Sequence, residues 1–418
     1  MNIVSRLKSA RARLLLLLAV IGPGIITTNV DNDAGGITTY SVAGAHYGNS
    51  LLWALPLAGI TLFFAQEMSA RLGVITGKGL ADLIREKFGV RWTALIIGIM
   101  VFANWANTVS EFAGVAASME IFGVSKYISV PLAAIGVWLL VVKASYKSVE
   151  RVFLVASVFY ISYVASALMA KPAWPAVLRA AVTPSFQFDT GYLLLLVTLI
   201  GTTVAPWQQF YQQSAIVDKG LKPPHLNYEM VDVLVGIVYA ILVVGFIVVT
   251  CASTLFVNGV PIETAKDAAL ALRPLAGAHA ATLFALGLLN ASLLASAVLP
   301  LSTAYVVCEA FGWESGVSKR LSEAPVFFGI HAALILLGGG VVLLPLKSLV
   351  ATMMASQTLN GVILPIVMVV MLRLVNDRGL LGRYANRGLY NVLAWAIVIV
   401  LIALTIILLA AALFPGMG

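Results

Sequence analysis

Two short stretches of this chain place polar and helix-breaking residues inside long apolar runs. The first covers residues 31–36 and reads DNDAGG, and the second covers residues 201–209 and reads GTTVAPWQQ. A carboxylate at bilayer depth costs a few kcal/mol or more unless something compensates it, and each glycine weakens a helix by about 1 kcal/mol. Pro206 cannot donate a backbone hydrogen bond and obstructs the carbonyl of Thr202. The two stretches are therefore the places where the chain offers atoms to a ligand.

The atoms on offer are oxygens, because neither stretch contains a cysteine or a histidine. An anionic, all-oxygen site suits a hard cation such as Mg²⁺, which prefers octahedral oxygen ligands and keeps several waters. Asp31 is interpreted as accessory to Asp33. Gln357 and Asn360, one helical turn apart, either bind the ion through water or line its path. The candidate ligands are Asp33, Asp31, Gln208, Gln209, Gln357, Asn360 and the carbonyls near Ala205.

The composition is that of a membrane protein. Of 418 residues, 61% are hydrophobic and 11% are charged, whereas soluble domains carry roughly a quarter charged residues. The net charge of +8 is spread over short loops without forming a patch, so it does not predict nucleic-acid binding. Cys251 and Cys308 lie in apolar runs and are interpreted as packing residues.

Apolar runs of roughly 20 residues predict an all-α polytopic protein with about eleven transmembrane helices. The basic residues before the first run are interpreted as its cytoplasmic flank, since no cleavage site follows them. The predicted helices cover residues 14–46, 50–70, 93–122, 127–142, 152–170, 191–217, 230–257, 279–311, 325–345, 349–375 and 390–414.

The distribution of basic residues predicts the orientation of these helices. With a cytoplasmic N-terminus and eleven crossings, most of the 26 Lys and Arg residues fall on the cytoplasmic side. The C-terminus is then extracellular, and the protein is expected in the bacterial inner membrane. The basic residues on the outer side are Lys126, Lys171, Arg179, Lys266, Arg273 and Lys347.

The two polar stretches interrupt the first and the sixth predicted helices near their midpoints. Interruptions at corresponding positions of two halves are typical of transporters with inverted repeats and a binding site at the middle of the membrane. We therefore predict a single transmembrane domain over residues 1–418, with repeats at 14–170 and 191–375 and an additional helix at 390–414. The repeat rests on the placement of the breaks, because the two halves share no residue-level similarity. Helix kinks with incidental polar residues are the alternative.

Several further segments make the chain resemble the NRAMP family of divalent-metal transporters over nearly its whole length. The resemblance implies the amino-acid-transporter-like fold and transport by alternating access. It rests on Gly22-Pro23-Gly24, the run at 70–78, Glu111, residues 267–275 and Ser356-Gln357.

The family's metal-binding motifs are only partly retained. Its Asp-Pro-Gly-Asn motif aligns with residues 33–36, so the aspartate is kept as Asp33 and the asparagine becomes Gly36. Its Met-Pro-His motif aligns with residues 205–207, so the methionine becomes Ala205 and the histidine becomes Trp207. Losing a soft thioether removes a preference for transition metals, and the smaller residues make room for a partly hydrated ion. The pattern resembles the Mg²⁺-transporting branch of the family, which also accepts Mn²⁺.

The residues that the resemblance links to proton movement have changed as well. Glu111 is kept, but the aspartate three residues earlier aligns with Thr108, and the histidines of the sixth helix are gone. We expect uncoupled, downhill transport driven by the ion gradient and by the membrane potential, worth roughly 2.3 kcal/mol per charge per 100 mV. The candidate path residues are Asn360, Glu111, Trp207 and Thr108.

Other functions stay open on the sequence. A proton-coupled Mn²⁺/Fe²⁺ importer is the first alternative, and a sodium-coupled amino-acid transporter is a less favoured one. An intramembrane enzyme would need a nucleophile with a base or a histidine-rich metal site, and the sequence predicts neither. We expect no cofactor and no nucleic-acid partner, only the transported ion and the bilayer. A monomer is the simplest expectation for the oligomeric state.

Polar residues elsewhere in the apolar runs have simpler interpretations. Asn104 and Asn107 are predicted to form hydrogen bonds between helices. Glu67, Glu111 and Glu309 suit either an ion path or hydrogen-bonded structural positions.

Overall fold

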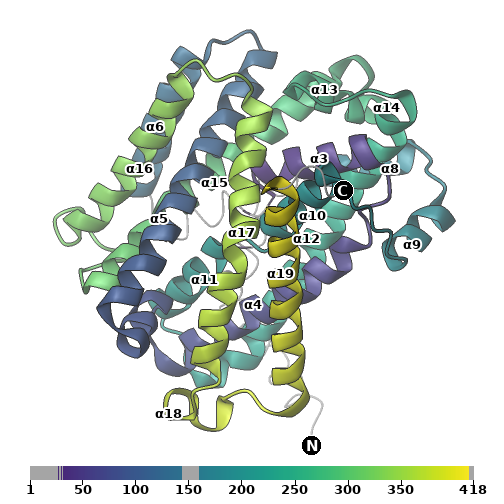
Figure 1. Ribbon diagram of the computed structural model, residues 1–418. Helices are drawn as coiled ribbons and strands as arrows, with labels where there is room; N and C mark the ends of the chain where they lie inside the picture. The colour runs from purple at the N-terminus through teal and green to yellow at the C-terminus, as the bar shows by residue number, and fades with distance from the viewer. Residues whose placement is uncertain (1–26, 28–29, 31, 144–159, 414–418) are drawn as a thin grey trace, which may run out of the picture.

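The computed structural model describes residues 27, 30, 32–143 and 160–413, and over these residues the protein is helical with no strand. The all-α prediction is therefore confirmed (Figure 1). The longer helices are α3 (Ala34–Tyr47), α4 (Ala54–Thr76), α5 (Leu80–Ile121), α6 (Lys126–Lys143), α8 (Ile161–Met169), α9 (Trp174–Val182), α10 (Thr190–Thr203) and α11 (Pro206–Asp218). They continue with α12 (Leu226–Thr254), α15 (Ala280–Phe311), α16 (Pro325–Leu343), α17 (Leu349–Val375) and α19 (Gly388–Leu413), and α13 (Ala265–Ala269), α14 (Arg273–Ala276) and α18 (Arg378–Leu381) are short.

Eight helical segments in the described part of the chain are long and apolar enough to cross a bilayer. They coincide with eight of the predicted helices. The predicted helices at 14–46, 50–70 and 152–170 correspond to α3, α4 and α8, and the first and third of these are described only in part. The total of eleven crossings stays a prediction.

Two helices begin earlier than the hydropathy pattern predicts. The third helix was expected to start at residue 93, but α5 already starts at Leu80 and bends at Gly89, whose φ of 78° suits glycine. The seventh was expected to start at 230, but α12 starts at Leu226. The added turns of α5 are amphipathic, since they bury Leu80, Leu83 and Ile84 and expose Glu86 and Lys87, and a window of mean hydropathy does not detect such a segment.

The centre of the molecule is made by helices that are distant in the sequence. α5 packs along α15 and α17, α17 lies against α10, and α12 lies against α3 (Figure 1). At the crossing of α10 and α17, a Cβ on Gly201 would overlap the backbone of Gly361, so the two helices approach as closely as glycine allows.

Both predicted helix interruptions are present. Thr27 and Val30 are helical, Asn32 and Asp33 are not, and α3 begins at Ala34. In the sixth helix α10 ends at Thr203, and α11 starts anew with a proline in its first turn. Asp31 and the Gly22-Pro23-Gly24 segment lie outside the described residues.

Candidate functional site

Asp33 lies at the first interruption as the N-cap of α3. Its Oδ1 accepts a hydrogen bond from the amide of Gly36 at 2.6 Å, and the residue is buried. The next free amide of the same helix end, that of Ala34, donates to Glu111 Oε2 at 3.1 Å. The N-terminus of a helix carries partial positive charge, so it stabilises both carboxyl groups.

Glu111 reaches this helix end from α5, and its carboxyl group lies against that of Asp33. Both residues are buried, and Glu111 Oε1 has no hydrogen-bond partner among the described residues. Two carboxylates in contact repel each other unless a proton or a cation lies with them. The pair is therefore a place where positive charge is required.

Gln357 of α17 is the third side chain at this point, and it lies beside Asp33. Its Oε1 accepts a hydrogen bond from Asn360 at 2.9 Å, and Asn360 and Asn107 exchange two hydrogen bonds of 3.0 Å. The Gln357 oxygen is therefore turned toward Asn360. Its Nε2 is left without a hydrogen-bond partner. A Cβ on Gly35 would overlap the Gln357 amide, so glycine is required there for the side chain to reach Asp33.

The predicted hydrogen bonds between helices are confirmed for both asparagines of α5. Asn107 bonds to α17 as described, and Asn104 Nδ2 donates to Thr303 Oγ1 of α15 at 2.9 Å. Thr108 directs its hydroxyl to the carbonyl of Asn104 at 2.8 Å, within its own helix.

The second interruption is closed on itself. The carbonyl of Ala205 accepts the backbone amide of Gln208 at 3.1 Å. The Gln209 side-chain amide lies 2.9 Å from the carbonyls of both Ala205 and Pro206, and turned with its nitrogen toward them it donates to both. The carbonyls of Ala205 and Pro206 are therefore occupied within the break in this conformation, whereas the predicted freeing of the Thr202 carbonyl by Pro206 stays a prediction. Gln209 is engaged with the break, and its backbone carbonyl accepts Ser69 Oγ at 2.6 Å.

The remaining predicted residues are placed around these two breaks. Gly36 lies in the first turn of α3, where its amide serves Asp33. Gln208 is fully buried in the first turn of α11. Trp207 is buried too, and its carbonyl accepts Ser302 Oγ at 3.2 Å.

Asn32 is a candidate that the sequence analysis did not single out. Its side chain is 1% exposed, and neither its amide oxygen nor its nitrogen has a hydrogen-bond partner. Its backbone carbonyl accepts the hydroxyl of Tyr160 at 2.6 Å. The signal was present, since an amide between two aspartates in a helix break offers a further oxygen.

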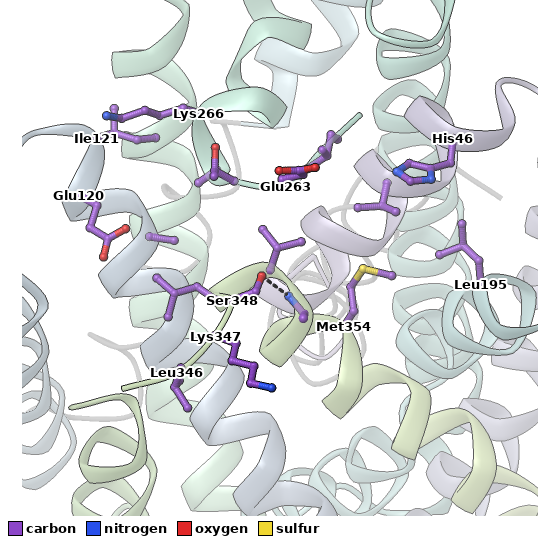
Figure 2. A pocket seen from close by; sticks show the side chains of 18 of the residues that line it. His46, Glu120, Ile121, Leu195, Glu263, Lys266, Leu346, Lys347, Ser348 and Met354 are labelled. Carbon is purple, nitrogen blue, oxygen red and sulfur yellow. Dashed lines mark hydrogen bonds between the residues drawn. The ribbon is translucent and has the colours of Figure 1, made fainter. Parts of the chain in front are cut away.

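A cavity of about 940 Å³ opens on the face that carries residues 122–125 and 344–348. Figure 2 shows His46, Glu120, Glu263, Lys266 and Lys347 around it, with Met354 deeper on α17. Along α3, Thr38 lies between Asp33 and Val42, which lines the cavity, and the Thr38 hydroxyl lies 3.5 Å from the sulfur of Met353.

The opposite face is held together by polar contacts. Lys78 pairs with Glu86 at 2.6 Å and Lys87 with Asp377 at 2.5 Å. Glu67 pairs with Arg71 at 3.0 Å and accepts the hydroxyl of Tyr390, so its structural interpretation is supported.

Glu309 is also part of this closed face. It accepts the hydroxyl of Ser214, and its carboxyl group fills the space beside Gly79, at the N-terminus of α5. Its contacts join α15 to α11 and to the loop before α5.

Comparisons with known proteins agree with this architecture. The family described as natural resistance-associated macrophage protein-like (Nramp) matches residues 24–411. The divalent metal cation transporter MntH of Verminephrobacter eiseniae is 29% identical, with 93% of this chain and 88% of that protein covered. MntH of Bacillus subtilis is 26% identical, with 94% and 92% covered. A manganese transporter of Eremococcus coleocola has a similar structure, with a TM-score of 0.80, 20% identity, and 94% of this chain and 86% of that chain covered.

The fold and the interrupted helices thus define a polytopic membrane transporter. The chain belongs to the Nramp family. The fold is shared more widely, because MhsT in complex with L-phenylalanine also matches, with a TM-score of 0.62, 15% identity, and 96% of this chain and 98% of that chain covered.

Proposed function

We propose that this protein carries Mg²⁺, and also Mn²⁺, across the bacterial plasma membrane by alternating access. The observation that carries the proposal is the buried contact between Asp33 and Glu111 at a helix break. A divalent cation supplies the positive charge that this pair lacks. The names of the relatives, a divalent metal cation transporter and a manganese transporter, support the same class of substrate.

The choice of Mg²⁺ follows from the ligand types. The groups nearest to Asp33 are carboxyl, amide and backbone groups, whereas position 205 carries alanine and position 207 a buried tryptophan. In the described part of the chain no three His, Cys, Asp or Glu residues are grouped so that they could hold a metal ion. A protein that supplies few charged ligands leaves room for water, which suits an ion that dehydrates reluctantly.

The route of the ion is inferred from the face that carries the cavity and the opposite face, which carries the ion pairs. With the N-terminus in the cytoplasm, as the charge distribution predicts, the cavity opens to the outside and the face bridged by Lys87 and Asp377 is cytoplasmic. The ion enters from the cavity, reaches Asp33 past Thr38 and Met353, and leaves when the cytoplasmic contacts open. In this assignment the structure is the conformation closed to the cytoplasm.

Transport without protons is part of the proposal, because Thr108 offers no titratable group and its hydroxyl is bonded within α5. A proton-coupled importer is the second candidate. It is favoured by the contact of Glu111 with Asp33, since a proton can also supply positive charge to a carboxyl pair.

The test is uptake into proteoliposomes that contain a Mg²⁺ indicator and, separately, a pH indicator. We expect Mg²⁺ uptake that is driven by a negative internal potential and is not accompanied by internal acidification. Asp33→Ala should abolish uptake, whereas Glu314→Gln, at an exposed ion pair with Lys319, should leave it unchanged. Acidification in step with uptake would establish the proton-coupled alternative, and uptake by Asp33→Ala would refute the site.

A further inference from the structure

A second pair of acidic residues is buried away from the helix breaks, on α12. Glu229 and Asp232 lie one turn apart on one face of the helix, and both are 0% exposed. Each lies within the electrostatic influence of the other. Burying two carboxyl groups together is costly unless a proton, a cation or strong hydrogen bonds compensate it.

The described surroundings of Glu229 supply little of that compensation. Neither carboxyl oxygen of Glu229 has a hydrogen-bond partner, and none of the ion pairs found in the described part of the chain involves it. Lys219, at the end of α11, is the described cation whose charge acts on it. A structural carboxyl group would normally be bonded, so the open oxygens indicate that Glu229 serves another purpose.

A third polar side chain, Gln212 of α11, lies at the same place. It lies beside Glu229, it is 0% exposed, and both its amide oxygen and its amide nitrogen lack hydrogen-bond partners. A buried amide without partners costs about 1–3 kcal/mol, and such a group is expected where a polar ligand binds. Gln212 belongs to another helix and is neutral, so it adds a second kind of polar group beside the acidic pair.

The position of these groups relates them to the ion path. Gln212 follows Gln208 by one turn on α11, and it lies about 10 Å along the helix from the break at Ala205. Its neighbour Gln213 bonds to the carbonyl of Lys78, on the face opposite the cavity. The groups therefore lie between the second helix break and the closed face.

We propose that Glu229, Asp232 and Gln212 form a second binding site for the divalent cation, on the way from the helix breaks to the closed face. The inference rests on the proposed transport function. Two carboxylates and an amide oxygen leave several positions for water, as Mg²⁺ and Mn²⁺ require. The site binds the ion after it leaves Asp33 and releases it when the closed face opens.

The test counts bound Mn²⁺ by electron paramagnetic resonance on the purified full chain, with Mn²⁺ as the only added metal. We expect two ions for the unchanged protein, one each for Asp33→Ala and Glu229→Gln, and none for the double variant. In proteoliposomes, Glu229→Gln should lower the maximal rate of Mn²⁺ uptake about tenfold, as loss of one charged ligand implies. Glu314→Gln is the matched control on an exposed carboxyl group and should change neither result.

The outcomes separate the two proposals. One bound ion in the unchanged protein that is lost in Asp33→Ala but not in Glu229→Gln would overturn the second site and leave the proposed function standing. If Asp33→Ala left the number of bound Mn²⁺ ions unchanged, the proposed function would be overturned. If the Glu229→Gln variant binds the same number of Mn²⁺ ions as the parent but no longer conducts protons, Glu229 is a proton carrier. That result would also contradict the second site.

Folding is checked independently. Since Glu229 makes no hydrogen bond through its carboxyl oxygens, Glu229→Gln should unfold in detergent at the same temperature as the parent or a higher one. Gln212→Leu keeps the volume of the side chain and removes the amide, so it should lose the same bound ion. A large drop in unfolding temperature for both variants would show that the groups serve the fold, and the second site would be rejected.

Discussion

The two helix breaks differ in what they leave open. The break before α3 carries charge and unpartnered oxygens, on Asn32 and on Glu111. The break before α11 is neutral, and Gln209 occupies the carbonyls of Ala205 and Pro206. In this conformation the first break therefore has oxygens available for a cation. At the second break, the hydrogen bonds to the carbonyls of Ala205 and Pro206 must break before these carbonyls can bind a cation.

This difference assigns separate tasks to the two breaks. The helix end at α3 already offers its amides to the carboxyl groups, so little reorganisation accompanies binding. At the break before α11, an ion must displace the buried Gln209 amide from the carbonyls of Ala205 and Pro206. Binding of an ion there therefore requires a change in conformation. Under the proposed function, the first break holds the ion and the second couples ion binding to a movement of α11.

The largest expected effect comes from removing the charge of the first break while keeping its cap. Asparagine caps a helix as well as aspartate does, so Asp33→Asn should retain the bond from Gly36 and the stability of the fold. Mg²⁺ uptake should nevertheless fall more than about 100-fold, because a neutral amide contributes far less to binding a dication. Uptake and thermal unfolding of the same preparation measure both effects. Uptake near that of the parent would mean that the charge of Asp33 does not bind the ion.

Gly35→Ala should act on the same break through geometry. The added methyl group would overlap the Gln357 amide, so Gln357 must turn away from Asp33. We expect uptake to fall about tenfold, as displacement of a positioning group commonly does. Gly98→Ala is the matched control, since no atom outside its own stretch of helix lies within 4 Å of the new methyl group. Equal activity of the two variants would show that Gln357 is not needed beside Asp33.

Particular residues show how far the sequence predicts this site. Both breaks and the position of Asp33 at the first of them follow from local chemistry, because a proline, two glycines and a carboxylate in apolar runs are costly wherever the helices pack. The bond between Gln209 and the Ala205 carbonyl could not be predicted, since it depends on how the chain turns at Pro206. Glu229 lies just before the predicted helix at 230–257, and only the packing of α12 buries it. Burial is a property of the assembled bundle, so it lies outside what a hydropathy window can detect.

Ala205→Met should change the selectivity of the second break. A thioether is a soft ligand that favours Mn²⁺ over Mg²⁺. We expect the ratio of Mn²⁺ to Mg²⁺ uptake to rise several-fold, measured by competition in proteoliposomes. Ala205→Leu has a similar volume without sulfur and should lower uptake of both ions alike. If the two variants behaved identically, space and not ligand chemistry would decide selectivity at position 205.

Gln209→Leu should free the backbone carbonyls of the break before α11 without changing the charge of the break before α3. The substitution removes two hydrogen bonds to backbone carbonyls, and each contributes about 1 kcal/mol. We expect stability to fall by about 2 kcal/mol in denaturant titrations and the ion-dependent change in conformation to weaken. Thr61→Val, which removes one hydrogen bond within α4, is the control and should cost about 1 kcal/mol. Unchanged stability of Gln209→Leu would mean that its amide does not hold the break.

The smallest effect is expected at the ion pair that bridges the closed face below the second break. Its hydrogen bond from Lys87 lowers the pKa of Asp377. Because the pKa is lower in the folded protein, the pair stabilises above the ordinary aspartate value of about 3.9, and this contribution is lost as pH falls further through the folded value. Exposed pairs contribute up to about 1 kcal/mol, so Asp377→Asn should destabilise by less than that at pH 7, and by progressively less as the pH falls below the ordinary aspartate pKa. Thermal unfolding of Asp377→Asn, Lys87→Met and the double variant measures the coupling. Additive losses would show that the pair does not act as one unit, and the closed face would then depend on Glu309 and Arg71 instead.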